Sequence, residues 1–154
     1  MKIELQKEIN NHVLEIIKLG DQYLESLYPP ESNHLVRVSD LISDWFEFYL
    51  MKDENKIIGS IGISFKHINP EIKRMFIRTE FRGMGYSHKL LNFIVNRCDK
   101  LGYKKIQLET GISQPEAISV YEKHGFRRIR PFNDYKEDPL SIFFEFIKSK
   151  DFFN

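Results

Sequence analysis

The sequence predicts an α/β protein in which helices flank a mixed β-sheet. Two observations favour this fold class. Segments of strand length alternate with segments of helical periodicity in the second half of the chain, an order typical of strand–helix–strand units with right-handed crossovers. The chain has 154 residues, 42% hydrophobic and 29% charged, which is the size and composition of one soluble globular domain. We therefore expect a single domain spanning residues 1–154.

A strand and a long helix are expected first. Residues 2–5 alternate between polar and apolar side chains, which is the period of a strand. A helical apolar pattern follows until two prolines, Pro29 and Pro30, end it. The apolar residues at helical spacing are Val13, Ile16, Ile17, Leu24 and Leu27.

Two strands joined by a hairpin turn are expected next. Residues 31–44 mix turn-forming residues with a short helical pattern at 39–42. The segments 45–51 and 56–65 are rich in β-branched and aromatic residues, and the polar residues 53–55 between them are typical of a turn.

The remaining elements alternate in type. A strand at 71–77 leads through a glycine-bearing turn into a helix. A strand at 104–110 and a helix at 114–123 follow, and strands at 126–130 and 141–147 finish the order. The helix after the glycine-bearing turn has apolar residues at helical spacing: Leu90, Leu91, Ile94, Val95, Cys98 and Leu101.

Charge and hydropathy exclude several classes of partner. Lysine and arginine total 23 and aspartate and glutamate 22, and no block of like charge stands out, which argues against a basic surface that neutralises the phosphates of a nucleic acid. The N-terminus lacks the apolar region of a signal peptide, and no apolar run is long enough to span a bilayer. We expect neither a nucleic-acid nor a membrane partner, and a cytoplasmic location.

Neither the single cysteine nor the histidines indicate a reactive or metal site. Cys98 stands in the apolar pattern of a helix, where a buried small hydrophobic residue is favoured over a nucleophile. The five histidines are scattered, and no set of His, Cys, Asp or Glu has the spacing of metal ligands. We therefore expect no metal.

The turn between residues 77 and 87 indicates a phosphate site. A strand feeds a turn containing Gly83 and Gly85, and a helix begins at once. Several backbone N–H groups then point at one place, where the helix dipole also favours negative charge. Glycine has no Cβ, so the backbone can approach a ligand closely.

Two common phosphate sites do not fit this turn. A nucleotide P-loop would need Lys and Ser or Thr after Gly85, where Tyr86 and Ser87 stand. A dinucleotide fingerprint would need a third glycine or alanine at the position of His88. From the turn alone, a tight strand-to-helix connection without a ligand remains an alternative.

The surrounding residues resemble the GNAT superfamily of N-acetyltransferases. Its central motif has Arg or Gln, two residues, Gly, one residue, and Gly or Ala. Arg82, Gly85 and Ser87 stand at those places, with Ser87 as the one departure. The segments LETG at 108–111 and QPEAISVYEKHGF at 114–126 resemble later family motifs, the second of them a cofactor segment.

A narrower resemblance reaches the two ends of the chain. YPPESNH at 28–34 and PFNDYKEDPLSIFF at 131–144 are similar to segments of a group of small bacterial GNAT proteins whose substrates are mostly unsettled. This similarity narrows the fold more than it narrows the substrate.

The resemblance implies a fold and a reaction. The fold would be a mixed, mostly antiparallel central sheet of six to seven strands flanked by helices. The reaction would transfer an acetyl group from acetyl-CoA, the cosubstrate, to the primary amine of a small molecule, with an amino acid favoured. A non-catalytic acyl-CoA-binding or sensor module, acetylation of a protein or peptide amine, and a homodimer remain open.

The resemblance also places the cofactor. The strand before the turn would splay from its neighbour, so that backbone N–H groups of Met75, Phe76 and Ile77 bind the thioester carbonyl and the pantetheine arm. Lys89 is a further candidate for the CoA phosphates. The other cofactor-binding residues would be Arg82, Gly83, Met84, Gly85, Tyr86, Ser87, His88, Gln114, Tyr121 and Lys123.

Catalytic roles follow from the family positions. Tyr121 matches a tyrosine that serves many members as general acid toward the CoA sulfur, and a phenol is protonated at neutral pH. Glu71 and Glu109 are rival candidates for the base that takes the amine proton, and a free amine captured from solution would need no base.

By the resemblance, the acceptor site would lie in the region between the first helix and the second strand and at the last hairpin. Arg74 could pair with a substrate carboxylate, which is the reason an amino acid is favoured. The other candidates for substrate binding are Glu31, His34, Asp134 and Tyr135.

Overall fold

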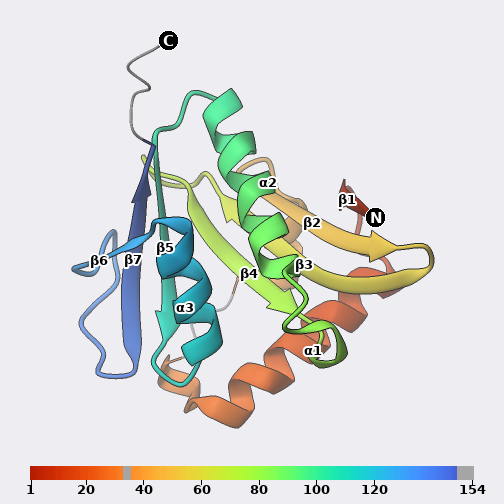
Figure 1. The fold of residues 1–154 in the computed structure, drawn as a ribbon, viewed down its shortest axis with the longest axis horizontal. Helices are drawn as coiled ribbons and strands as arrows, with labels where there is room; N and C mark the ends of the chain where they lie inside the picture. Colours follow the sequence, from red (N-terminus) through yellow and green to blue (C-terminus); the bar gives the residue numbers. More distant parts are fainter. Residues whose placement is uncertain (33–35, 149–154) are drawn as a thin grey trace.

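The computed structural model describes residues 1–32 and 36–148, whose seven strands form one sheet (Figure 1). The strands are β1 (Lys2–Leu5), β2 (Phe46–Asp53), β3 (Lys56–Ser64), β4 (Glu71–Ile77), β5 (Lys105–Gly111), β6 (Arg127–Ile129) and β7 (Ser141–Ile147). The helices are α1 (Asn11–Leu27), α2 (Tyr86–Lys100) and α3 (Pro115–His124), with short 3-10 helices η1 (Pro30–Ser32), η2 (Val38–Ile42) and η3 (Thr79–Phe81).

The sheet has the order β1-β2-β3-β4-β5-β7-β6, and β4–β5 is its one parallel pair. A mixed, mostly antiparallel sheet of six to seven strands flanked by helices is thereby confirmed. Most predicted elements agree with the structure to within one or two residues. The strand predicted at 126–130 is shorter in the structure, because only Arg127–Ile129 pairs with β7.

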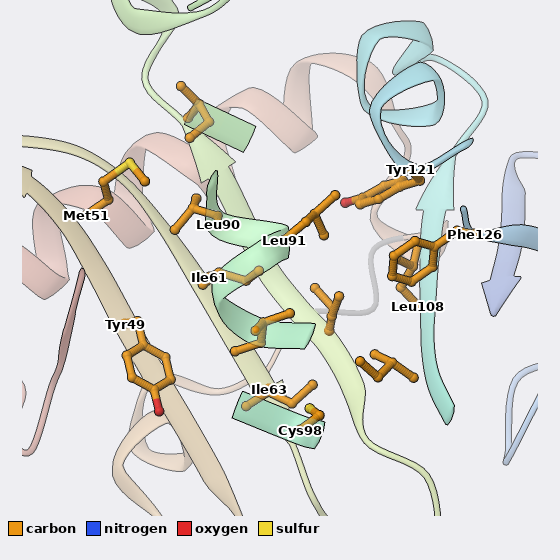
Figure 2. Packing of buried hydrophobic residues seen from close by; sticks show 14 of the residues in the cluster. Tyr49, Met51, Ile61, Ile63, Leu90, Leu91, Cys98, Leu108, Tyr121 and Phe126 are labelled. Carbon is orange, nitrogen blue, oxygen red and sulfur yellow. The ribbon is translucent and has the colours of Figure 1, made fainter. Parts of the chain in front are cut away.

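The two faces of the sheet carry separate apolar cores. Along β2, Tyr49 and Met51 join the cluster that includes the buried face of α2, whereas Phe48 and Leu50 join the cluster that includes α1. Successive strand residues point to opposite faces, so one strand supplies both cores. Figure 1 shows α2 and α3 in front of the sheet, and Figure 2 shows the core beneath them.

Local residue choices set where the helices begin and end. Asn10 caps α1, because its side-chain oxygen accepts the N–H of Val13 at 2.9 Å. Gly85 precedes α2 with φ +82°, and Gly125 follows α3 with φ +107°. Both values lie in the left-handed region, where glycine carries no Cβ penalty.

A β-bulge interrupts β4. Gly59 and Ser60 of β3 pair with Ile77 and Phe76, but Gly62 already pairs with Lys73, so β4 holds one extra residue in this stretch. Arg74 has φ +57°, and its carbonyl accepts the Ser60 hydroxyl at 2.8 Å. The bulge bends β4 next to the point where it leaves β5.

Cys98 is buried, as predicted. It packs in the cluster under α2, and burial raises the pKa of its thiol to about 12 (Figure 2). The thiol therefore stays protonated at neutral pH and acts as a packing group. Within residues 1–32 and 36–148, no helix has the length and hydropathy needed to cross a membrane.

Candidate active site

The central opening of the molecule lies between β4 and β5. The two strands pair only through Glu71 with Gln107 and Ile72 with Leu108. Beyond Ile72 they separate, so the remainder of β4 has no strand partner on its β5 side. The predicted splay is thus present, and β4 keeps hydrogen-bonding groups that a ligand can use.

A groove of about 700 Å³ extends from this opening to the turn before α2. Nearly all residues predicted to bind the cofactor line it: Met75, Phe76, Ile77, Arg82, Gly83, Gly85, Tyr86, Ser87, His88, Gln114, Tyr121 and Lys123. Met84 does not line it and is 63% exposed. Lys89 also lies outside the groove, with its ammonium 5.6 Å from the ring centre of Tyr86.

The turn before α2 is shaped for an anion. Gly83 has φ +78° and Gly85 has φ +82°, and a Cβ built at either residue would meet no atom within 4 Å. The backbone therefore faces open space. The N–H groups of the first turn of α2 have no partner within the helix, and they carry the positive end of its dipole. These features suit the pyrophosphate of CoA.

Arg82 holds this turn in place. Its Nε donates a hydrogen bond to the carbonyl of Ile77 at 3.0 Å. Its guanidinium lies 4.3 Å from the ring centre of Tyr23 on α1, within the range of a cation–π contact. Arg82 therefore connects the turn to both β4 and α1.

A second, smaller cavity of about 110 Å³ adjoins the groove. Five residues line both spaces: Leu24, Arg74, Met75, Gln114 and Tyr121. A group delivered along the groove would therefore meet a molecule in the smaller cavity beside Met75 and Tyr121.

Tyr121 lies buried at this junction. Its hydroxyl is 3.6 Å from the Met75 sulfur, and its ring packs on Phe126 and Phe144. In Figure 2 the hydroxyl points away from Phe126 and toward Leu91. Burial, and then the charge of Glu109, raises the pKa of the Tyr121 phenol. The phenol is therefore protonated at neutral pH and available as a proton donor.

Glu71 and Glu109 both line the smaller cavity but have different surroundings. Glu71 is 5% exposed, accepts the Tyr135 hydroxyl at 2.6 Å and lies 3.5 Å from the Lys73 ammonium. Glu109 accepts the Ser141 hydroxyl at 2.8 Å. Burial and then the charge of Glu71 raise the pKa of Tyr135. Both residues thus lie at the wall of the same cavity.

The predicted acceptor residues are only partly brought together. Tyr135 lines the smaller cavity, whereas Glu31 and Asp134 line neither space. His34 falls outside the residues that the structure describes.

Arg74 lines both spaces, but its guanidinium already has partners in the protein. Its guanidinium pairs with Asp21 of α1 and donates to the carbonyl of Val36 at 2.7 Å. The side chain is 8% exposed, and its Nε is covered without a partner among the described residues. Arg74 therefore braces the bulge of β4 against α1, and its guanidinium is already paired within the protein.

Lys73 and Tyr28 line the smaller cavity but were not among the predicted site residues. Lys73 lines it, and its ammonium donates to the Tyr135 hydroxyl at 2.9 Å. The two-residue period of a strand places Lys73 on the face of Glu71, so the pattern could have indicated it. Tyr28 lines the cavity from the end of α1. Its hydrogen-bond partners Ser113 and Gln114 lie 85 and 86 positions away in the sequence. A local sequence pattern cannot predict contacts between residues so far apart.

A histidine beside the groove should make stability depend on pH. Burial, and then the neighbouring His88, lowers the pKa of His124. The folded protein then binds fewer protons than the unfolded chain, so the free energy of unfolding should fall as pH drops from about 7 to about 5. Urea unfolding across this range checks it, with His124→Gln expected to show a weaker decline. Equal pH dependence in both proteins would remove His124 from this role.

Comparisons with known proteins agree with this geometry. The family described as acetyltransferase (GNAT) family matches residues 14–126. An IAA acetyltransferase from Azospirillum brasilense is 34% identical over 93% of this chain and 95% of that protein. The uncharacterized N-acetyltransferase YsnE of Bacillus subtilis is 30% identical over 84% of this chain and 89% of that protein.

A solved structure matches the fold. The GNAT family acetyltransferase from Elizabethkingia anophelis with acetyl-CoA bound superposes with a TM-score of 0.66 at 22% identity, covering 95% of this chain and 97% of that one. The family match and the two relatives show that the chain belongs to the GNAT family, as an acetyl-CoA-dependent N-acetyltransferase.

Proposed function

We propose that the enzyme acetylates the primary amine of a small molecule and that an amino acid is the favoured acceptor. The observation that carries this proposal is the cavity of about 110 Å³ that meets the groove at Met75 and Tyr121. Its size suits a small molecule, and its walls carry charges of both signs. We further propose that residues 1–154 act as one domain.

The groove residues account for the cosubstrate. The turn from Arg82 to Ser87 would hold the pyrophosphate, and the unpartnered side of β4 would hold the pantetheine arm. Acetyl-CoA supplies the acetyl group as a thioester. Free N–H groups of β4 near Met75 would stabilise negative charge on the thioester carbonyl during attack by the amine.

Transfer of the acetyl group requires the ammonium group to lose a proton and the CoA sulfur to gain one. Glu109 would accept a proton from the acceptor's ammonium group, which leaves the amine nitrogen free to bond to the acetyl carbon. As the carbon–sulfur bond breaks, Tyr121 would donate its proton to the sulfur of CoA. The second proton of the amine is released as the amide forms and can restore the phenol.

Glu109 is the better candidate for the base. Its charge contributes to the raised pKa of Tyr121, which indicates that the two groups are close. The carboxylate of Glu71 is buried and is engaged by both Tyr135 and Lys73. Glu71 would therefore hold these two side chains in position at the wall of the cavity.

Lys73 takes the place proposed at first for Arg74. Its side chain is 20% exposed, and it lines the cavity that also contains Glu109. An amino acid carries an ammonium and a carboxylate a few bonds apart, which matches a cavity with an acidic and a basic side chain. A charge-assisted hydrogen bond of this kind is strong enough to discriminate between acceptors.

The acceptor proposal is tested by removing the carboxylate from the substrate. With acetyl-CoA, alanine should give a kcat/KM roughly tenfold or more above that of ethylamine, the size of one charge-assisted hydrogen bond. Lys73→Met should reduce this preference, whereas Lys56→Met, at an exposed residue outside both spaces, should not. Equal rates for alanine and ethylamine would exclude a carboxylate site.

A further inference from the structure

The phenol of Tyr28, at the wall of the smaller cavity, makes two hydrogen bonds. Tyr28 caps the end of α1, where its backbone N–H donates to the carbonyl of Leu24 at 2.9 Å. The phenol reaches across to the segment between β5 and α3. There its oxygen accepts the backbone N–H of Ser113 at 3.1 Å, and its hydroxyl donates to Oε1 of Gln114 at 3.0 Å.

Gly111 leaves the space that the Tyr28 ring occupies. A Cβ at residue 111 would lie 1.9 Å from the Tyr28 oxygen and 2.1 Å from Cζ. Any other residue there would displace the ring. The glycine at the end of β5 therefore leaves room for the Tyr28 ring. Tyr28 is 8% exposed.

The two bonds of the phenol determine which way the Gln114 amide faces. A phenol carries one proton and accepts through its lone pairs. The Ser113 N–H can only donate, so the phenol accepts from it and has its single proton left for Gln114. In the structure the amide oxygen Oε1 accepts this proton, at 3.0 Å. The NH₂ group of Gln114 then points away from Tyr28.

The orientation has a chemical consequence for the groove. Gln114 lines both spaces, and among the described residues its Nε2 makes no hydrogen bond. A fixed NH₂ group at this wall offers donors and no acceptor. It suits a carbonyl oxygen, such as those of the amide groups in the pantetheine arm.

We infer that Tyr28 is a positioning residue for cosubstrate binding, which acts by holding the Gln114 amide with its NH₂ group toward the groove. The inference rests on the proposed placement of acetyl-CoA in the groove. Without Tyr28, the amide would rotate freely and could present its oxygen to the carbonyl of the ligand. The loss should therefore appear in the affinity for acetyl-CoA rather than in the rate of the chemical step.

Tyr28→Phe tests this role. It should raise the KM for acetyl-CoA about three- to tenfold, the size of one hydrogen bond, and leave kcat nearly unchanged. Calorimetry with acetyl-CoA and no acceptor should show the same fall in affinity. A larger effect on kcat, or on the KM of the acceptor amine alone, would overturn the inference, because Tyr28 also lines the acceptor cavity.

Variants of Gln114 separate positioning from general loss of structure. Gln114→Glu keeps an acceptor for the Tyr28 hydroxyl but has no donor for the groove, so it should weaken acetyl-CoA binding as much as Gln114→Ala. In the Gln114→Ala background, Tyr28→Phe should add no further change in KM, because the group that Tyr28 positions is absent. Effects that multiply would show that Tyr28 does not act through Gln114.

The outcomes also distinguish the inference from the proposed function. If the unchanged protein binds acetyl-CoA and Tyr28→Phe binds it equally well, the inference alone fails. If the unchanged protein does not bind acetyl-CoA at all, the placement of the cosubstrate fails and the inference falls with it. If Tyr28→Phe does not fold, the comparison of Gln114→Glu with the unchanged protein still decides whether the NH₂ group matters.

Discussion

Tyr121→Phe should lower kcat by about 10²- to 10⁴-fold, the usual contribution of a general acid, while acetyl-CoA binding stays within a fewfold of the unchanged protein. The phenol is buried at the junction of the two spaces and is the proton donor that we propose. The substitution removes one oxygen and keeps the ring that packs on Phe126 and Phe144. Steady-state thiol release gives kcat, and calorimetry gives the affinity for acetyl-CoA.

A matched control separates this effect from any loss of packing. Tyr103→Phe removes the same oxygen from a tyrosine that stacks on Phe65 and lines neither space. It should leave kcat unchanged. If Tyr121→Phe also retained its kcat, another group or solvent would have to protonate the sulfur, and Tyr121 would be a packing residue only.

Glu109→Gln should lower kcat/KM by roughly 10²-fold or more near pH 7, where the acceptor is almost entirely an ammonium ion and needs a base. Glutamine can still accept the hydroxyl of Ser141, so the fold of this wall should persist. The defect should shrink as pH rises toward the pKa of the acceptor amine, because free amine then enters without help. A pH–rate profile from about pH 6 to about pH 10 measures this recovery.

Glu71→Gln is the matched comparison for Glu109. It would weaken the contacts of Glu71 with Tyr135 and Lys73, so it should mainly raise the KM of the acceptor. Its defect should not recover at high pH. If Glu71→Gln gave the large defect that recovers at high pH and Glu109→Gln did not, the roles of the two carboxylates would be exchanged.

Much of the fold could be predicted because it depends on local patterns. The apolar periodicity of α1 and α2 and the alternation along β1 are visible in the sequence, and so are the glycines of the turn at Gly83 and Gly85. The turn could be predicted because glycine adopts a positive φ without a steric penalty, as Gly83 and Gly85 do here.

The bulge at Arg74 could not be predicted in the same way. A positive φ is unfavourable for arginine, and no local preference favours it there. The conformation is held by contacts with Asp21 and Val36, which lie 53 and 38 residues away. These contacts also explain why the sequence assigned Arg74 to a substrate: an arginine on a site strand indicates a charge, but not the partner that already neutralises it.

The geometry of the smaller cavity likewise could not be predicted from the sequence. Tyr28, Glu71, Lys73 and Tyr135 meet there from α1, β4 and the segment before β7. The hydrogen bonds that these side chains make join residues that are 62 to 86 positions apart in the sequence. The exception is the contact between Glu71 and Lys73, which are both on β4. Motif similarity could identify single members such as Tyr121, but the different hydrogen-bond partners of Glu71 and Glu109 appear only in the folded chain.

The central claim is that acetyl-CoA in the groove reacts with a small amine in the adjoining cavity. The most direct measurement is thiol release from acetyl-CoA with a panel of amino acids, polyamines, aminoglycosides and peptides, together with IAA, the compound named in the Azospirillum relative. We expect release that depends on the added amine, is fastest with an amino acid and yields one N-acetylated product per thiol. Stabilisation by acetyl-CoA without amine-dependent release from any member of the panel would contradict the claim and indicate a binding module.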